Sequence, residues 1–208
     1  MTLLLADDHA MFRESLRVLL EREGFAIAVE ATNGLEAVRL AREHHPTIAV
    51  LDIGMPFLNG IDAARQMHKR VPDCAVIVLT MFEDDMHVLA ALRAGVRGYV
   101  LKAQAASDLV AAIREVERGA VYLSPGISHT LVEHWLKHTD AGGDPLTERE
   151  RQVLQLVAEG KSLREIAGIL SISAKTADSH RTRMMNKLDL HNTAALVRYA
   201  VRSGLVQA

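Results

Sequence analysis

Short apolar runs alternate with stretches of helical periodicity along residues 1–120, and this alternation constrains the fold more than any other feature. The runs lie at residues 3–6, 26–29, 48–51, 75–79 and 99–101. Each is short enough for a buried strand, and the apolar residues between them recur every three or four positions, as at Phe12, Leu16 and Leu19. Such strand–helix repetition predicts a parallel sheet with helices on both faces.

Cap signals support two of the intervening helices. Asn33 precedes Glu36 by three residues, and Asn59 precedes Asp62 with the same spacing. An asparagine side chain at this position accepts a hydrogen bond from the first free backbone N–H groups of a helix. We therefore predict an α/β doubly wound domain, with a five-stranded parallel sheet in the order 2-1-3-4-5.

The rest of the chain has a different periodicity. "TERE", from Thr147 to Glu150, and "SLRE", from Ser162 to Glu165, are capping boxes that each open an apolar-periodic stretch. Two more helices are expected over residues 173–188 and 193–203, which gives a small all-α four-helix domain. The second and third helices, with a tight turn at 171–172, have the dimensions of a helix-turn-helix.

These patterns divide the chain into three parts. We predict an α/β domain over residues 1–122, a linker over 123–143 and a helical domain over 144–208. Leu131, Trp135 and Leu136 are spaced for a short amphipathic helix within the linker, and residues 141–145 are typical of a flexible joint.

Charge differs between the two domains. Residues 1–123 carry 13 Lys and Arg against 17 Asp and Glu, a net charge of −4, whereas residues 144–208 carry 10 against 7, a net charge of +3. A mildly basic second domain weakly favours a polyanionic partner.

Composition excludes other classes. Cys74 is the single cysteine, so the chain has no internal disulfide framework and suits a reducing compartment. No stretch approaches the roughly 18 apolar residues of a membrane span. Asp7 and Asp8 follow the start without a basic region, unlike a secretory signal. We expect a cytoplasmic protein with no membrane partner.

Polar side chains follow four of the predicted strands. Asp7 and Asp8 end the first, Asp52 the third, Thr80 the fourth and Lys102 the fifth. In the predicted strand order these ends meet at the reversal point, where ligands of open parallel sheets bind. Three close carboxylates repel one another unless a cation such as Mg²⁺ offsets them. One carboxylate could then attack a phosphoryl group, with Lys and Thr stabilising its oxygens.

A single aspartate at a strand end is more often a turn or cap residue, but four suitable strand ends together disfavour that explanation. His9 is adjacent to the acids, and we interpret it as an exposed residue at the start of the first helix rather than as a metal ligand.

The segments "LADDHAMFRESL", "AVLDIGMPFLNGID", "VIVLTMFED" and "GYVLKA" together resemble the receiver domain of bacterial two-component response regulators. The resemblance implies that Asp52 accepts a phosphoryl group from a sensor histidine kinase. It implies Asp8 and Asp52 as direct Mg²⁺ ligands, Asp7 as a ligand through water, and the backbone carbonyl of Gly54 as a further ligand. The resemblance also implies that Thr80 and Lys102 contact the phosphoryl group. It places Tyr99 at the aromatic switch position of the family.

The expected helix 173–188 combines an apolar face with an exposed polar one. Ala177, His180, Met184 and Leu188 recur on the core side. The candidate DNA-contacting residues are Lys175, Thr176, Asp178, Ser179, Arg181, Thr182, Arg183 and Lys187. Basic side chains suit phosphate contacts and the polar ones suit base edges. An ordinary solvated surface helix is the alternative on charge alone.

The segment "LTERERQVLQLVAEGKSLREIAGILSISAKTADSHRTRMMNKLDLHN" resembles the LuxR-type DNA-binding domain, and the two resemblances together are those of a NarL/FixJ-type response regulator. They imply double-stranded promoter DNA as a partner and residues 173–188 as the recognition helix. Asp178 stands where several members carry a basic residue. We hypothesise that Asp178 reads a base, for instance a cytosine amino group.

The last expected helix is apolar on more than one face. We assign a dimer surface to Ala195, Leu196, Tyr199 and Ala200. A homodimer formed on phosphorylation or DNA binding would bring two recognition helices to neighbouring half-sites. Extra packing within a small domain is the alternative.

The sequence thus predicts a transcription regulator switched by phosphorylation of Asp52, and not an enzyme. One rival is a Mg²⁺-dependent phosphatase with an aspartyl-phosphate intermediate, but such enzymes commonly carry an acid two residues after the nucleophile, where this chain has Gly54. The other is a DNA-binding or protein-interaction regulator that works without phosphorylation.

Overall fold

A computed structural model describes residues 1–81, 85–125, 127 and 145–206. The chain divides into two compact units, Met1–His138 and Thr139–Ala208. The predicted linker helix around Leu131, Trp135 and Leu136 lies outside the described residues.

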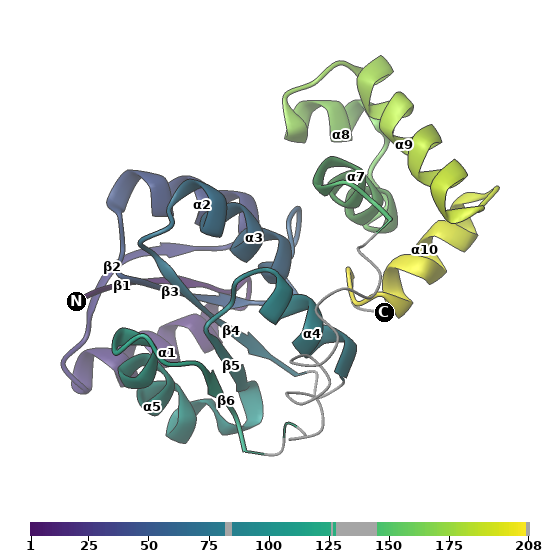
Figure 1. The fold of residues 1–208 in the computed structure, drawn as a ribbon. Helices are drawn as coiled ribbons and strands as arrows, with labels where there is room; N and C mark the ends of the chain where they lie inside the picture. Colours follow the sequence, from purple (N-terminus) through teal and green to yellow (C-terminus); the bar gives the residue numbers. More distant parts are fainter. Residues whose placement is uncertain (82–84, 126, 128–144, 207–208) are drawn as a thin grey trace. The chain divides into compact units, whose positions relative to one another are not determined.

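The first unit is built on one parallel sheet (Figure 1). Its strands are β1 (Thr2–Ala6), β2 (Ala26–Ala31), β3 (Ile48–Asp52), β4 (Ala75–Thr80), β5 (Gly98–Leu101) and β6 (Tyr122–Leu123). Their order is β2-β1-β3-β4-β5-β6. The predicted order of the first five strands is therefore confirmed, and the prediction of five strands is corrected to six.

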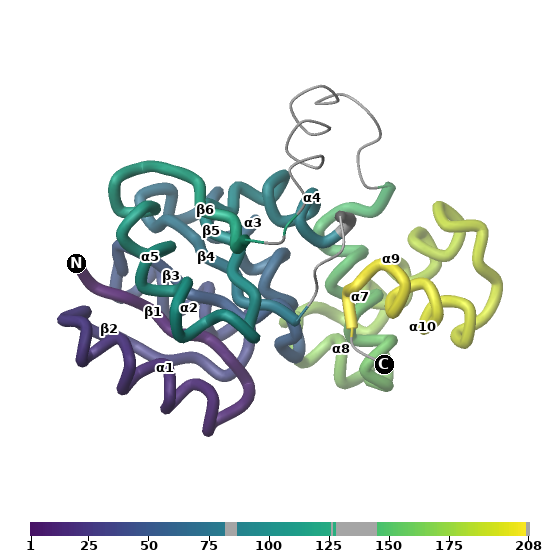
Figure 2. The backbone as a smooth tube through the Cα atoms, turned by 90° about the horizontal axis from the view of Figure 1, so that it is seen from below, coloured from purple at the N-terminus to yellow at the C-terminus, as the bar shows by residue number. Residues whose placement is uncertain are grey.

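Helices cover both faces of this sheet, as predicted (Figure 1 and Figure 2). They are α1 (Ala10–Arg22), α2 (Gly34–His44), α3 (Gly60–Arg70), α4 (Asp85–Arg93) and α5 (Ala105–Glu117), and a short 3₁₀ helix, η1 (Lys102–Gln104), joins β5 to α5. The helices α1 and α5 pack on one face, and α2, α3 and α4 on the other. Asn33 and Asn59 cap α2 and α3 through Glu36 and Asp62, as their spacing predicts.

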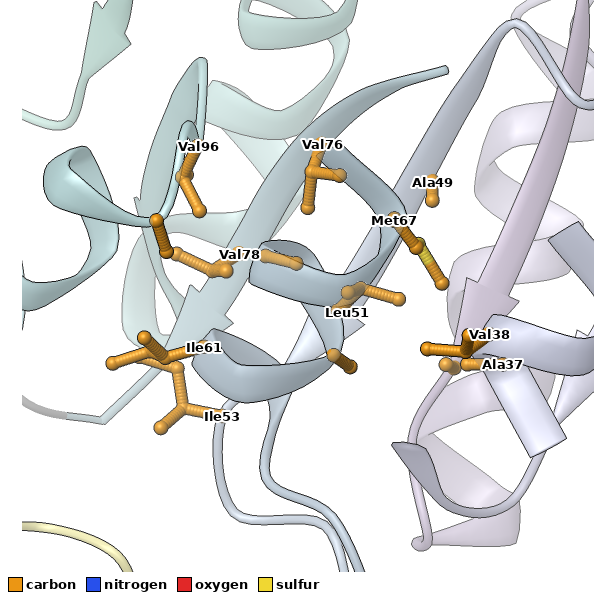
Figure 3. Packing of buried hydrophobic residues seen from close by; sticks show 14 of the residues in the cluster. Ala37, Val38, Ala49, Leu51, Ile53, Ile61, Met67, Val76, Val78 and Val96 are labelled. Atoms are coloured by element: carbon orange, nitrogen blue, oxygen red, sulfur yellow. The ribbon is translucent and has the colours of Figure 1, made fainter. Parts of the chain in front are cut away.

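Alternation along the central strands divides the core into two clusters. In β1, Leu3 and Leu5 join the cluster under α1 and α5, whereas Leu4 joins the opposite one. In β3, Val50 and Leu51 separate in the same way. Figure 3 shows part of the cluster beneath α2, α3 and α4, in which Leu51 lies among side chains of α2, α3 and β4. Burial on both faces explains why these strands are uninterrupted apolar runs.

The sixth strand follows from polar contacts rather than from an apolar pattern. Only two residues pair with β5, and no period can be read from so short a segment. Ser124, directly after β6, donates its backbone N–H to the carbonyl of Tyr99 at 2.9 Å. Its hydroxyl accepts from the N–H of Leu101 at 3.2 Å and donates to Oδ2 of Asp108 at 2.8 Å. The buried Ser124 therefore ties the end of the sheet to both β5 and α5.

The second unit is helical. It contains α7 (Glu148–Ala158), α8 (Leu163–Leu170), α9 (Ala174–Leu188) and α10 (Thr193–Arg202). Both predicted capping boxes form, with Thr147 and Glu150 on α7 and Ser162 and Glu165 on α8. Ser171 takes a left-handed conformation (φ 52°) in the tight turn between α8 and α9, so the helix-turn-helix is confirmed. Among the described helices, none has the length and apolar character to cross a membrane.

We predict that Ser124→Ala destabilises the first unit by about 1–3 kcal/mol, because it leaves the buried N–H of Leu101 without its acceptor. Urea unfolding of the full chain, followed by circular dichroism, measures this change. Ser107→Ala is the matched control, since the exposed Ser107 hydroxyl also donates to Asp108. Equal losses in both variants would contradict the anchoring role of Ser124.

Candidate functional site

The three predicted carboxylates converge beyond the carboxyl ends of β1 and β3. Ala6 of β1 pairs with Leu51 of β3, so Asp7 and Asp52 follow at the same edge of the sheet. Carboxylate oxygens of Asp7, Asp8 and Asp52 and a ring nitrogen of His9 all lie within 4.8 Å of one another. The sheet topology thus brings together acids that are more than forty positions apart in the chain.

These residues differ in exposure. Asp7 and Asp52 are each only 2% exposed, whereas about a third of the Asp8 side chain (34%) and two thirds of His9 (66%) are open to solvent. Nδ1 of His9 lies 2.9 Å from Oδ1 of Asp8. The exposed position of His9 at the start of α1 is the one that the sequence predicts.

Lys102, at the end of β5, reaches into this acidic cluster. Its Nζ lies 2.8 Å from Oδ2 of Asp7 and 2.9 Å from Oδ2 of Asp52. The other oxygen of Asp7 accepts the backbone N–H of His9 at 2.8 Å. One ammonium group therefore joins the ends of three strands, as the positions of these residues in the sequence predict.

Burial governs the protonation of the cluster. Burial raises the pKa of Asp52, as does the charge of Asp7, while Lys102 and the backbone N–H of Gly54 oppose the rise without cancelling it. Burial lowers the pKa of Lys102, but its contacts with Asp7 and Asp52 outweigh burial and raise the value. The pocket thus favours the charged form of Lys102 and makes Asp52 easier to protonate than an aspartate in water.

The cluster fits a small, hard cation. Oδ2 of Asp52 is buried and, within the described part of the chain, accepts no hydrogen bond of good geometry although Lys102 is near. Oxygen ligands of this kind suit Mg²⁺, which commonly takes one or two carboxylates and keeps several waters. The acidic pocket is therefore compatible with Mg²⁺.

Of the three remaining predicted residues of the pocket, two lie on adjacent strands and one in a loop. Thr80 ends β4 opposite Leu101 of β5, and it is buried. Tyr99 of β5 is fully buried in the cluster beneath α2, α3 and α4. Gly54, two residues beyond Asp52, is half-buried in the loop that leads to α3.

In the second unit, α9 turns one face inward and leaves the other exposed. Ala177 and Met184 are fully buried, whereas His180 and Leu188 are only half-buried. The predicted contact residues Lys175, Thr176, Asp178, Thr182, Arg183 and Lys187 are exposed, and Ser179 and Arg181 are half-exposed. The polar face that the sequence predicts is therefore available to a ligand of this unit.

Some of these side chains also have contacts within the unit. Nζ of Lys187 lies 2.7 Å from Oε2 of Glu150, the capping-box residue of α7. Burial raises the pKa of Glu150, but the hydrogen bonds from Lys187 and Thr147 outweigh it and hold the value below the usual range. Arg181 donates to the hydroxyl of Thr193 at the start of α10. These contacts attach the middle of α9 to the start of α10 and its C-terminal end to α7.

Comparison with known proteins identifies both units. Residues 3–114 match the response regulator receiver domain, and residues 144–200 match the luxR family of bacterial regulatory proteins. The chain belongs to the LuxR-family response regulators.

Relatives extend over the whole chain. The oxygen regulatory protein NreC of Staphylococcus carnosus is 33% identical over 99% of both chains. The transcriptional regulatory protein MctR of Rhizobium johnstonii is 35% identical over 98% of this chain and 94% of its own. A structure of RcsB from Salmonella enterica serovar Typhimurium, bound to promoter P1flhDC with the phosphomimetic BeF₃⁻, is 28% identical. It covers 96% of this chain and 97% of its own, with a TM-score of 0.62. This response regulator is thus a two-component DNA-binding regulator, as the sequence predicts.

Two residues beside the pocket of this response regulator were missed by the sequence analysis. Phe12 places its ring beneath the Lys102 ammonium, with 4.8 Å between Nζ and the ring centroid. Arg13 donates from Nη1 to the backbone carbonyl of Asp7 at 2.7 Å and from Nε to Oε2 of Glu30 at 2.8 Å. Their place in the first helical turn after the paired acids is the only signal that the sequence offers.

The assignment of a dimer surface to α10 requires a correction. Leu196 and Ala200 are fully buried, so they belong to the core of their own domain. Ala195 and Tyr199 keep part of their surface exposed. A small domain needs most of a helix's apolar surface for its own core. This need explains why two of the four predicted dimer residues are buried within the domain.

We predict that Asp52→Asn stabilises this response regulator at pH 7. The folded pKa of Asp52 is raised, so its ionisation costs stability; the cost is absent below the unfolded value near 3.8 and complete above the folded pKa. We therefore expect a higher melting temperature for Asp52→Asn than for the wild type at neutral pH. The gain shrinks as the pH falls towards 4, and calorimetry between pH 4 and pH 8 measures it.

Mg²⁺ provides the complementary test. Millimolar Mg²⁺ should raise the melting temperature of the wild type and have a smaller effect on Asp52→Asn, because a bound ion stabilises the folded state by mass action. Asp73→Asn, at an exposed position, is the control. Equal stabilisation of all three proteins would contradict a Mg²⁺ site at Asp52.

Proposed function

We propose that Asp52 is the phosphoacceptor of this response regulator and receives its phosphoryl group from a sensor histidine kinase. The observation that carries the proposal is the buried Asp52 carboxylate, held at one strand end between a lysine and two further acids. Asp8 and Asp52 would hold Mg²⁺ directly, Asp7 through water, and Gly54 through its carbonyl. The bound ion supplies positive charge that offsets the carboxylates and the phosphoryl oxygens.

The chain's own residues account for the transfer. An oxygen of Asp52 attacks phosphorus, the Asp52 O–P bond forms, and the P–N bond to the kinase histidine breaks with the electron pair going to the imidazole. Lys102 already lies 2.9 Å from Asp52, so its ammonium stabilises a phosphoryl oxygen with little movement. Thr80, at the end of the neighbouring strand, donates its hydroxyl to another oxygen.

β5 would carry the state of the pocket to the chain that follows β6. Tyr99 is fully buried and is separated from Lys102 by only two residues of β5. Ser124 hydrogen bonds to both Tyr99 and Leu101, so the chain directly after β6 is fastened to the strand that ends beside the pocket. Phosphorylation would draw Thr80 inward, and Tyr99 would follow. This movement would shift an existing conformational equilibrium of the surface around β4 and β5.

The exposed face of α9 supports recognition of double-stranded promoter DNA. Lys175, Arg181, Arg183 and Lys187 would contact phosphates, and Thr176, Asp178, Ser179 and Thr182 would face the bases. A helix of this length fits the major groove, and basic residues at its edges fix its register. The related RcsB was solved bound to a promoter, which supports the same use of this unit.

Self-association completes the proposal. A homodimer formed on phosphorylation or DNA binding places two copies of α9 on neighbouring half-sites. Ala195 and Tyr199, the exposed part of the predicted set, would contribute to it. Since its signal comes from a kinase and its target is DNA, we place the protein in the cytoplasm, with no membrane partner.

Of the rival functions, a phosphatase is disfavoured by the residue two positions after Asp52. Gly54 has no side chain to protonate a leaving group or activate a water, so the acid that such phosphatases commonly carry at this position is missing. We therefore propose that the phosphoryl chemistry of this chain serves its own regulation and is not an enzyme activity.

A small phosphodonor tests the phosphoacceptor. Acetyl phosphate with Mg²⁺ should label the wild type and leave Asp52→Asn unlabelled, and the label should be lost at alkaline pH as an acyl phosphate is. Asp8→Asn should need more Mg²⁺ for the same labelling, whereas Asp73→Asn should match the wild type. DNA affinity and dimer content, measured by fluorescence anisotropy and light scattering, should rise only in labelled protein. Unlabelled wild type, or a response in Asp52→Asn, contradicts the proposal.

A second prediction concerns base recognition by Asp178. Selection of bound DNA fragments gives the preferred sequence, and Asp178→Ala should lose discrimination at one base pair, worth about 1–3 kcal/mol. Lys175→Ala, by contrast, should weaken binding to all sequences and reduce the salt dependence of the affinity by about one charge. If Asp178→Ala changes affinity uniformly and leaves the preferred sequence intact, Asp178 does not read a base.

A further inference from the structure

We propose that Phe12 is a positioning residue for phosphoryl transfer: the face of its ring holds the Lys102 ammonium over the pocket, between Asp7 and Asp52. The inference rests on the proposed role of Asp52 and adds a residue to it. Phe12 would touch neither the phosphoryl group nor the metal ion, and it would act through Lys102 alone.

The geometry is that of a cation–π contact. Nζ of Lys102 lies 4.8 Å from the centroid of the Phe12 ring, within the roughly 6 Å over which the ring's quadrupole attracts a cation. Two carboxylates occupy other sides of the same ammonium, at 2.8 and 2.9 Å. Only 13% of the Lys102 side chain is exposed, so the three partners exclude most of the water that would otherwise surround its charge.

The position of the ring is itself fixed. Phe12 lies in the first turn of α1 and packs against the core cluster beneath α1 and α5. The next residue, Arg13, hydrogen bonds to the backbone carbonyl of Asp7 and to Glu30, which attaches this turn to the ends of β1 and β2. The ring and the Asp7 carboxylate are therefore parts of one rigid corner.

A fixed ring matters because the Lys102 side chain is flexible and one of its two ion pairs is lost during transfer. Lysine is a compact charge on a flexible four-carbon stem. During transfer, a phosphoryl oxygen and a metal ion compete with Lys102 for the Asp52 carboxylate, so the lysine loses its present partner there. The ring attracts the Lys102 ammonium throughout this exchange. It therefore holds the ammonium where an oxygen of the transferred phosphoryl group arrives.

Phe12→Leu removes the ring but keeps an apolar side chain, and Phe12→Tyr restores a ring face. Labelling by acetyl phosphate at saturating Mg²⁺ should be about threefold to tenfold slower in Phe12→Leu and close to wild type in Phe12→Tyr. Phe25→Leu is the matched control, because Phe25 is also half-buried against the same core cluster but has no contact with Lys102. Its labelling rate should equal that of the wild type even where its melting temperature falls.

Mg²⁺ binding without a phosphodonor separates positioning from general damage to the pocket. Calorimetry should show that Phe12→Leu binds Mg²⁺ at least as tightly as the wild type, since Phe12 contributes no ligand atom. A wild-type labelling rate in Phe12→Leu, failed rescue by Phe12→Tyr, or weakened Mg²⁺ binding in Phe12→Leu would each overturn the proposal. If the wild type itself is not labelled, the phosphoacceptor assignment fails instead, so the two failures are distinguishable.

Discussion

The contact of Lys102 with Asp7 and Asp52 is the interaction on which the pocket depends. It joins residues 95 positions apart, at the ends of three strands. Two buried carboxylates at this distance would repel each other strongly, and the ammonium is the only described positive charge that lies between them. The ion pairs therefore hold the pocket in a compact state, but one in which Oδ2 of Asp52 accepts no hydrogen bond of good geometry within the described part of the chain.

This crowding of charged groups is possible because the surrounding sheet is rigid. The alternating strand residues fill two apolar clusters, and helices cover both faces, so the strand ends have little freedom to relax away from one another. Charge strain at the edge is thus balanced by apolar packing in the centre. A similar division of roles applies to the second unit, where buried Ala177 and Met184 fix α9 and its polar face stays exposed.

Local signals made most of this structure predictable from the sequence. Asparagine caps, two capping boxes and apolar runs of strand length each depend on neighbouring residues, and each appears as predicted. The predicted acids and Lys102 also converge, because the strand order fixes which strand ends are adjacent. Features that depend on three-dimensional contacts escaped prediction: the two-residue β6, the ring of Phe12 beside Lys102, and the burial of Leu196 and Ala200.

Two of the missed features, β6 and the ring of Phe12, meet at β5 and the lysine that follows it. At the end of the strand, Phe12 and the carboxylates surround Lys102; along its backbone, Ser124 binds Tyr99 and Leu101. The contacts of Lys102 and those of Ser124 therefore lie at the same four-residue strand. Coupling between distant sites needs a physical element that both sites can bias, and in the proposed function β5 with its attached Ser124 would be that element.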